Sequence, residues 1–392
     1  MRNNILIKII VLAIFTVTIC GACTTSSAYA DSETPQSIED SVYEQLDKLD
    51  LGDFEKFADK YGVYDGSIKI AVEKILNGST NVLSSSGISS LFDALIKDFI
   101  GFLPALLSVI VIAFIGGILK NSKSGFLKGS TSDVIDFVCF ASVLTIVLVF
   151  IKDYFYEAKN IISGLTELSD ITFPLMLTFM EISGSGNAMN TITFLSGTFS
   201  NVIMNAITFV VFPLILAVII LSVVGNLSAS VNLNRLKKSV SSTASWLLGI
   251  MFGLYTIVLT GCGIVGINMD NISIKAIKFA LSGYVPVIGG YLSSGMDYVL
   301  AGSIMIKNSV GFTVLIMLFS LILLPALKIL LFSLALDLTS GIISPIGDQR
   351  QCEMLSSLSG SLKLLVAVIL GAGFIFFIMI LFAISAGNAG IV

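Results

Sequence analysis

The sequence predicts an all-α, polytopic membrane protein with about six transmembrane helices. The mean hydropathy is +0.96, and 55% of the 392 residues are hydrophobic against 12% charged, which a soluble globule with a hydrated surface does not show. Several apolar runs reach the roughly 20 residues that a helix needs to cross a bilayer. Lysine and arginine cluster in short polar stretches between those runs, as they do in cytoplasmic loops.

Residues 1–30 have the pattern of a secretory signal peptide. Arg2 and Lys8 precede an apolar run, and the small residues that follow end in Ala28-Tyr29-Ala30. We expect cleavage after Ala30. An uncleaved anchor and a lipoprotein that uses Cys23 are the alternatives, and each of the three places the following segment outside the cytoplasm.

Residues 31–98 predict an acidic extracytoplasmic domain of two or three short helices. This segment holds 14 of the 26 acidic residues of the chain but only 6 basic ones, and its leucines and phenylalanines recur at helical spacing. The negative charge argues against binding nucleic acid or anionic lipid.

Six apolar runs predict the full spans. The first two occupy residues 99–158, at about 100–119 and 134–151. The next four lie at about 203–224, 246–267, 310–336 and 362–386. Lys120, Lys123 and Lys128 follow the first span, and Arg235 to Lys238 follow the third, so we expect both loops in the cytoplasm and both termini outside.

Residues 161–181 contain apolar side chains but also Glu167 and Asp170. Each carboxylate costs about 2.5–3.5 kcal/mol near the centre of a lipid-exposed helix, while a large apolar residue returns only about 0.3–0.6 kcal/mol. A full crossing would also move the Arg235 loop to the outside. We therefore expect a re-entrant or interfacial segment, broken at Pro174.

The prolines suggest a parallel internal repeat, with units at 159–268 and 269–392. Pro174 and Pro286 are 112 residues apart, and so are Pro213 and Pro325. In each unit a proline-broken segment precedes two membrane helices. The second broken segment, 282–298, also contains Gly289 and Gly290.

Broken helices at membrane depth leave backbone groups unpaired, which are tolerated only in protein or beside water. The two segments are therefore candidates for lining a pore, with flat surface caps as the alternative. Ionisable residues at membrane depth are functional candidates by default. For Lys328 and Asp337, snorkelling to the headgroups or mutual pairing is the competing interpretation. The candidate pore or packing residues are Glu167, Asp170, Pro174, Pro286, Gly289, Gly290, Asp297, Lys328 and Asp337.

Several function classes have no support in the sequence. The chain has no histidine, which excludes Ser-His-Asp catalysis and the usual imidazole metal sites. Its cysteines form no CxxC pair outside the leader, and no phosphate-binding loop with its lysine is present. We expect neither an enzyme nor a cofactor or metal site.

Two stretches resemble the stage III sporulation protein AE family. They are "YVPVIGGYLSSGMDYVLAGSIMIKNSVG" at 284–311 and "LPALKILLFSLALDLTSGIISPIGD" at 324–348. The signal peptide, the acidic domain, the length and the arrangement of spans are similar too, so the resemblance covers nearly the whole chain.

The resemblance implies a membrane component of a sporulation-specific, trans-envelope channel or secretion-like complex, in the mother-cell membrane around the forespore. It implies as partners the other proteins of a stage III sporulation operon and a forespore membrane protein. Homo-oligomers are possible on the same ground, and no catalytic residues are implied. The alternatives are a secondary transporter of a small solute and a membrane scaffold without a pore.

Overall fold

The computed structural model describes residues 51–62, 67–76, 85–121, 129–182, 186–227, 233–258 and 289–385. Every regular element in these ranges is a helix, which confirms the all-α fold class. Two short helices come first, α3 (Gly52–Tyr61) and α4 (Ile68–Leu76), and long apolar helices follow. The signal peptide expected at 1–30 lies outside the described residues.

The long helices are α5 (Ser85–Asn121), α6 (Gly129–Ile182), α11 (Gly289–Ile343) and α12 (Gln349–Ser385). Between α6 and α11 lie a helix composed of short pieces, which ends with α9 (Phe212–Leu227), and the helix Asn234–Val258. In the described part of the chain, six helices are long and apolar enough to cross a membrane. Each of them overlaps one of the six runs expected, the fourth of which is described only as far as Val258, so the polytopic character is confirmed.

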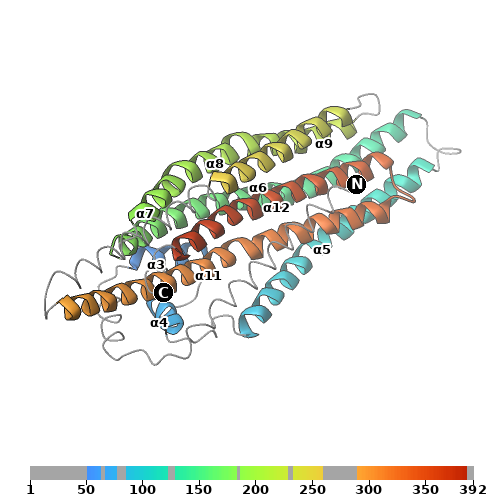
Figure 1. The fold of residues 1–392 in the computed structure, drawn as a ribbon. Helices are drawn as coiled ribbons and strands as arrows, with labels where there is room; N and C mark the ends of the chain where they lie inside the picture. The colour runs from blue at the N-terminus through green and yellow to red at the C-terminus, as the bar shows by residue number, and fades with distance from the viewer. Residues whose placement is uncertain are drawn as a thin grey trace.

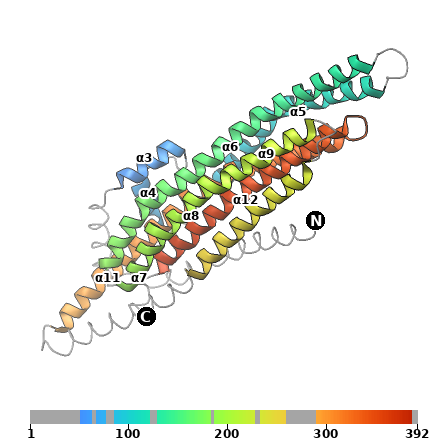
Figure 2. The same cartoon turned by 90° about the horizontal axis from the view of Figure 1, so that it is seen from above.

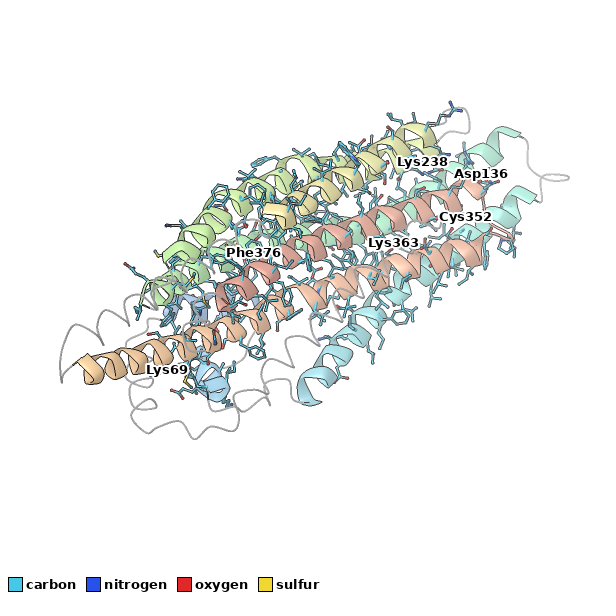
Figure 3. All side chains as sticks on the ribbon, in the orientation of Figure 1. Lys69, Asp136, Lys238, Cys352, Lys363 and Phe376 are labelled. Atoms are coloured by element: carbon cyan, nitrogen blue, oxygen red, sulfur yellow. The ribbon has the colours of Figure 1, made fainter. Side chains whose placement is uncertain are left out.

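These helices pack side by side along a common direction (Figures 1 and 2). The end of α5 meets the turn between α11 and α12 so closely that a Cβ atom on Gly117 would clash with the Ile346 carbonyl group. At the same end, Lys237 Nζ donates a hydrogen bond of 2.6 Å to Ser357 Oγ of α12. Figure 3 places Lys238, Asp136 and Cys352 there as well. The described helix ends next to residues 120–128 and 225–245, two loops expected on one side of the membrane, thus lie at one end of the bundle (Figure 1).

The core is widest around α12, which packs against α11, α9 and α6. Ser333 of α11 and Ser359 of α12 share a hydrogen bond of 2.9 Å between their hydroxyl groups in the fully buried seam. Nearby, Phe332 of α11 contacts the rings of Phe102, Phe150 and Tyr154 at centroid distances of 5.0–5.3 Å. Small residues bring the helices together, and aromatic rings fill the space between α5, α6 and α11.

The expectation of a re-entrant segment at 161–181 is wrong, because these residues form the last third of the continuous helix α6. Pro174 lies inside the helix and removes one N–H donor, that to the Asp170 carbonyl group, without ending it. The other turns of α6 and its contacts with α3, α11 and α12 hold the helix together across this position. The first expected crossing and the expected broken segment therefore form one helix.

The second expected break is also absent from the described residues. Helix α11 begins at Gly289 and continues without interruption to Ile343, with Pro325 inside it. Gly289 and Gly290 therefore start a helix instead of making a turn in the membrane. Pro286 lies outside the described residues, and Asp297 lies on α11 in a stretch whose side chains are not described. Of the two segments expected to correspond in the repeat, the first lies at the end of α6, and the described part of the second lies at the start of α11. Their positions in the two helices therefore differ.

Helices α6 and α11 are far longer than a bilayer is thick. With 54 and 55 residues, each measures about 80 Å at 1.5 Å per residue, against ~30 Å of hydrocarbon. Helix α3 lies against α6, and α4 lies against α11 (Figure 2). The domain boundaries expected at 98/99 and 158/159 fall inside α5 and α6.

Candidate functional site: a polar groove between α3, α6 and α8

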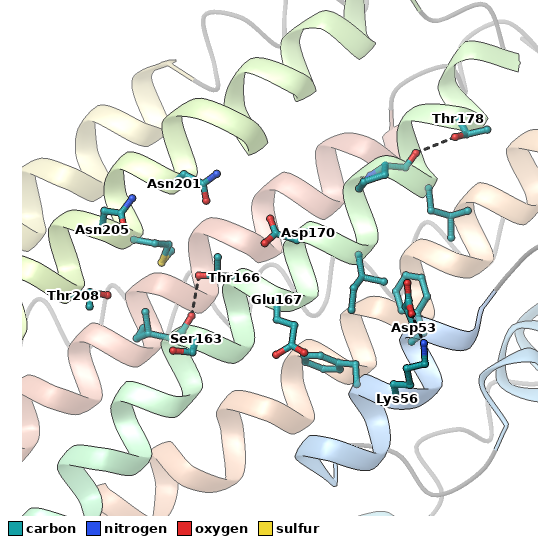
Figure 4. A pocket seen from close by; sticks show the side chains of 17 residues that line it. Asp53, Lys56, Ser163, Thr166, Glu167, Asp170, Thr178, Asn201, Asn205 and Thr208 are labelled. Atoms are coloured by element: carbon teal, nitrogen blue, oxygen red, sulfur yellow. Dashed lines mark hydrogen bonds and ion pairs between the residues drawn. The ribbon is translucent and has the colours of Figure 1, made fainter.

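A groove of about 930 Å³ opens on the side of the bundle, between α3, α6 and α8 (Asn201–Ala206) (Figure 4). It brings together three of the nine predicted site residues. Glu167, Asp170 and Pro174 all line it. Lys328 and Asp337 lie elsewhere, in the helix seams.

The α6 wall of the groove carries a stripe of polar residues beside the apolar Ile171 and Leu175. Ser163, Thr166, Asp170 and Thr178 recur at intervals of three, four and eight residues, which places them on one side over about four turns. Thr178 Oγ1 donates a hydrogen bond of 3.0 Å to the Pro174 carbonyl group. Thr166 Oγ1 donates one of 3.1 Å to the Ile162 carbonyl group. Both hydroxyls therefore have their hydrogen bonds within α6, in a pattern that often bends helices.

The opposite wall comes from a helix that contains two π-helical stretches. The chain continues from α7 (Gly186–Thr193) through η3 (Phe194–Ser200), α8 and η4 (Ile207–Val211) into α9. Asn201 and Asn205 of α8 and Thr208 of η4 line the groove. π-Helical turns are rare and are frequent at functional sites, so their position on both sides of this polar stretch supports a role for it.

Each π-helical stretch has a structural reason. Pro213, the second residue of α9, has no N–H to give to the Phe209 carbonyl group, and the wider turns of η4 precede it. On the other side, Ser200 Oγ contacts Met379 Sδ of α12 at 3.5 Å, and Phe199 stacks on Tyr255 at 5.9 Å between ring centroids. Packing on α12 and on helix 234–258 thus holds η3 in place.

Helix α3 closes the groove from the third side through Glu167. Lys60 Nζ donates a hydrogen bond of 2.7 Å to Glu167 Oε2, and the Tyr61 hydroxyl group donates one of 2.9 Å to the same oxygen. The bond to Glu167 raises the pKa of Lys60 above its usual value. Burial, and then the bond to Glu167, raise the pKa of Tyr61. Both donors therefore keep their protons at neutral pH, and the Lys60 contribution is lost only as the pH rises past the usual range of lysine.

A glycine of α6 permits this close approach. A Cβ atom on Gly164 would lie 3.0 Å from Tyr61 Cε1 and 3.3 Å from Leu321 Cδ2 of α11. Phe54 and Phe57 complete the contact as buried residues of α3. The charged side chains of α3, such as Lys56, stay exposed, so α3 is an amphipathic cover on the groove.

The groove lies at the edge of the apolar zone of the bundle. A Cβ atom on Gly164 of α6 would lie 3.3 Å from Leu321, and one on Gly311 of α11 would lie 3.3 Å from Met176. This part of α6 is therefore level with residues 311–321 of α11. That stretch belongs to the apolar candidate span Gly302–Ile343. The exposed charges of α3 need water or headgroups at the same level. We therefore expect the groove to extend across the boundary between lipid and water.

The other predicted ionisable residues form ion pairs between helices. Lys328 Nζ of α11 lies 2.8 Å from Asp98 Oδ2 of α5, a contact without the angles of a hydrogen bond. Glu157 of α6 is within electrostatic reach of both. Asp337 of α11 pairs with Lys363 of α12, which Figure 3 places between the two helices. The mutual pairing of Lys328 and Asp337 considered above is therefore wrong, because each has a nearer partner on another helix.

Sequence reasoning missed the residues that complete the groove. Asn201 and Asn205 have a detectable signal, an amide pair four residues apart at the start of an apolar run. Lys60 and Tyr61 have none, because their partner Glu167 is more than a hundred residues away in the chain.

Comparison with known proteins places these features in a family. The family model for stage III sporulation protein AE matches residues 67–387. Stage III sporulation protein AE of Bacillus subtilis (strain 168) is 23% identical over 367 residues, which cover 91% of this chain and 90% of the relative. No solved structure matches. Since the family model covers every helix from α4 to α12, the chain belongs to the stage III sporulation protein AE family and has a role in sporulation.

Proposed function

We propose that this chain is the membrane-spanning subunit of a sporulation-specific complex that connects the mother cell with the forespore. In this role it takes part in a trans-envelope channel or secretion-like assembly that late forespore development requires. Membership of the sporulation family over most of the chain carries the proposal. The subunit has no catalytic function of its own in this proposal.

The shape of the described helices supports an assembly role. Helices α6 and α11 are more than twice as long as the hydrocarbon layer is thick, so each extends well beyond the bilayer. Helices α3 and α4 pack on these two long helices. Such extensions offer contact surfaces to other proteins between two membranes. We place the subunit in the mother-cell membrane that surrounds the forespore, with α3 and α4 on its extracytoplasmic side.

A secondary transporter is the second candidate, and the polar groove favours it. Transporters bind solutes at polar sites among membrane helices, and the groove collects carboxylate, amide and hydroxyl groups beside apolar spans. A membrane scaffold without any conduit is compatible with the same extensions.

Deletion of the gene in a sporulating host tests the proposal. We expect vegetative growth to be unchanged and spore formation to stop after engulfment of the forespore. Purification of the tagged chain from sporulating cells, followed by sizing of the membrane complex, should recover other sporulation membrane proteins with it. A growth defect in non-sporulating cells, or recovery of the chain alone, would favour the transporter.

A further inference from the structure

Both walls of the groove carry polar side chains among apolar ones, which is the composition of a membrane helix interface. Small hydroxyl residues line α6, and Asn201, Asn205 and Thr208 line α8 and η4 at intervals of four and three residues. Serine, threonine and asparagine are the side chains that bring membrane helices together and form hydrogen bonds between them. From Ser163 to Thr178 the α6 wall is about 22 Å long at 1.5 Å per residue. A wall of this length suits about four turns of a helix.

Lipid does not suit this surface. Val202, Phe209 and Val210 are on the same helix as the polar wall, and they are 59%, 75% and 44% exposed. Such side chains face lipid tails favourably, but amide and carboxylate groups find no hydrogen-bond partners there. The carboxylate of Asp170 therefore needs water or another protein beside a surface that faces lipid.

The charges of the groove leave one carboxylate for an outside partner. Asp53 pairs with Lys56 at 2.9 Å, and Glu167 pairs with Lys60 at 2.7 Å. Asp170 has no ion pair with another residue of the described ranges. Figure 4 shows its carboxylate directed across the groove toward Asn201.

We propose that the groove is the docking site for a membrane helix of another protein, whose lysine or arginine side chain pairs with Asp170. This rests on the proposed function, because it requires a second membrane subunit. The helical occupant follows from the length and composition of the walls, and its basic residue follows from the charge of Asp170. Carboxylates at membrane depth commonly pair with basic side chains, and lysine and arginine near helix ends reach the headgroup level where the groove lies. A second copy that presents the same face would bring like charges together.

Photo-cross-linking in sporulating cells tests the position of the helix. A benzoylphenylalanine residue is placed at Thr178 or Asn205 in the groove, and at Val202 or Leu216 as controls that face outward on the same helix as Asn205. We expect the groove positions to form an adduct with one other membrane protein, and the controls to form none. Mass spectrometry should map the adduct to a membrane helix that carries a lysine or arginine.

Charge exchange tests the pairing. We expect Asp170→Lys to lower the yield of heat-resistant spores and the amount of adduct by about tenfold, with unchanged amounts of the chain in the membrane. Asp170→Asn should have a smaller effect, since it keeps the shape and removes only the charge. Changing the partner's basic residue to aspartate should restore the spore yield of the Asp170→Lys variant. The same change should not raise the spore yield of the wild type.

Other outcomes would overturn the proposal. They are an adduct with a second copy of this chain, an adduct with a helix that has no basic residue, equal adducts from groove and control positions, and a normal spore yield from Asp170→Lys. If partners co-purify with the chain but no groove position forms an adduct, the docking site is wrong and the proposed function stands. If no partner co-purifies, the proposed function is wrong, and the docking proposal that rests on it is wrong as well.

Discussion

The carboxylates in the helix seams and those in the groove are neutralised in different ways. In the seams, Asp98 and Asp337 each meet a lysine of another long helix, Lys328 and Lys363. In the groove, Glu167 meets a lysine of the short helix α3, and Asp170 meets none in the described part of the chain. The seams are thus complete within the subunit, while the groove is completed by an accessory helix and, in our proposal, by another protein.

The comparison predicts that substitutions in the two regions change different properties of the protein. Substitutions in the seams should change the stability of the subunit in isolation. Substitutions in the groove should change assembly and leave the stability of the isolated subunit close to that of the wild type.

The largest effect on stability is expected for Gly117→Ala in the contact between α5 and the α11–α12 turn. A Cβ atom there would clash with the carbonyl oxygen of Ile346, and backbone atoms cannot move aside as a flexible side chain does. We expect a loss of about 3 kcal/mol, at the upper end of typical overpacking costs, measured as thermal unfolding in detergent. Gly101→Ala is the matched control, because a Cβ atom on Gly101 of the same helix meets nothing within 4 Å. Equal stability of the two variants would contradict the close contact.

A smaller loss is expected when the seam between α11 and α12 keeps one charge without its partner. Lys363→Met leaves Asp337 unpaired, and both side chains are about one third exposed, so solvent reduces the cost. We expect a loss of about 1–2 kcal/mol, below the 3–5 kcal/mol seen for fully buried pairs. Stability should return toward the wild-type value in the double variant Lys363→Met with Asp337→Leu. A double variant less stable than the single one would show that the pair itself stabilises the seam.

The smallest effect is expected at the contact between α3 and the groove. Gly164→Ala introduces a methyl group 3.0 Å from the Tyr61 ring, which displaces α3 without disturbing the long helices. We expect a stability change of about 1 kcal/mol or less, since Tyr61 is a movable side chain. The readout is thiol labelling of Phe57→Cys in a background without native cysteines. It should rise in Gly164→Ala and stay low in Gly249→Ala, where a Cβ atom has free space among the described residues. Unchanged labelling would show that α3 is held by other contacts.

The six spans could be predicted from the sequence because apolar runs of that length have few other uses. The same reasoning failed at 161–181, because the cost assigned to Glu167 and Asp170 assumed contact with lipid. That assumption does not hold for Glu167, because this side chain contacts α3. The length of α6 removes it for the segment as a whole, because one helix of 54 residues does not have to lie entirely in the bilayer.

The candidate site was predicted in part, and the limits are physical. Glu167, Asp170 and Pro174 were singled out as polar or helix-breaking residues in an apolar context, and all three line the groove. Gly249 and Gly253 have the four-residue spacing common at membrane helix contacts, but a Cβ atom on either would meet nothing within 4 Å among the described residues, whereas Gly371 and Gly373 closely approach Phe252 and Ile322. Glycine spacing in a sequence indicates where helices can approach each other, but only the fold decides where they do.

The π-helical stretches determine which face of their helix the groove receives. Each π-helical turn accommodates one residue more than the α-helical pattern, and one residue corresponds to about 100° of rotation. Across η3 the buried residues Leu195 and Ser200 are five residues apart, against the intervals of three or four of an α-helical face. Removal of a single residue from η3 would turn every preceding residue by about that angle against α8, without changing any side chain of the groove. The orientation of the polar wall is therefore encoded by chain length as well as by residue type, and a deletion of one residue there is a larger change than most substitutions.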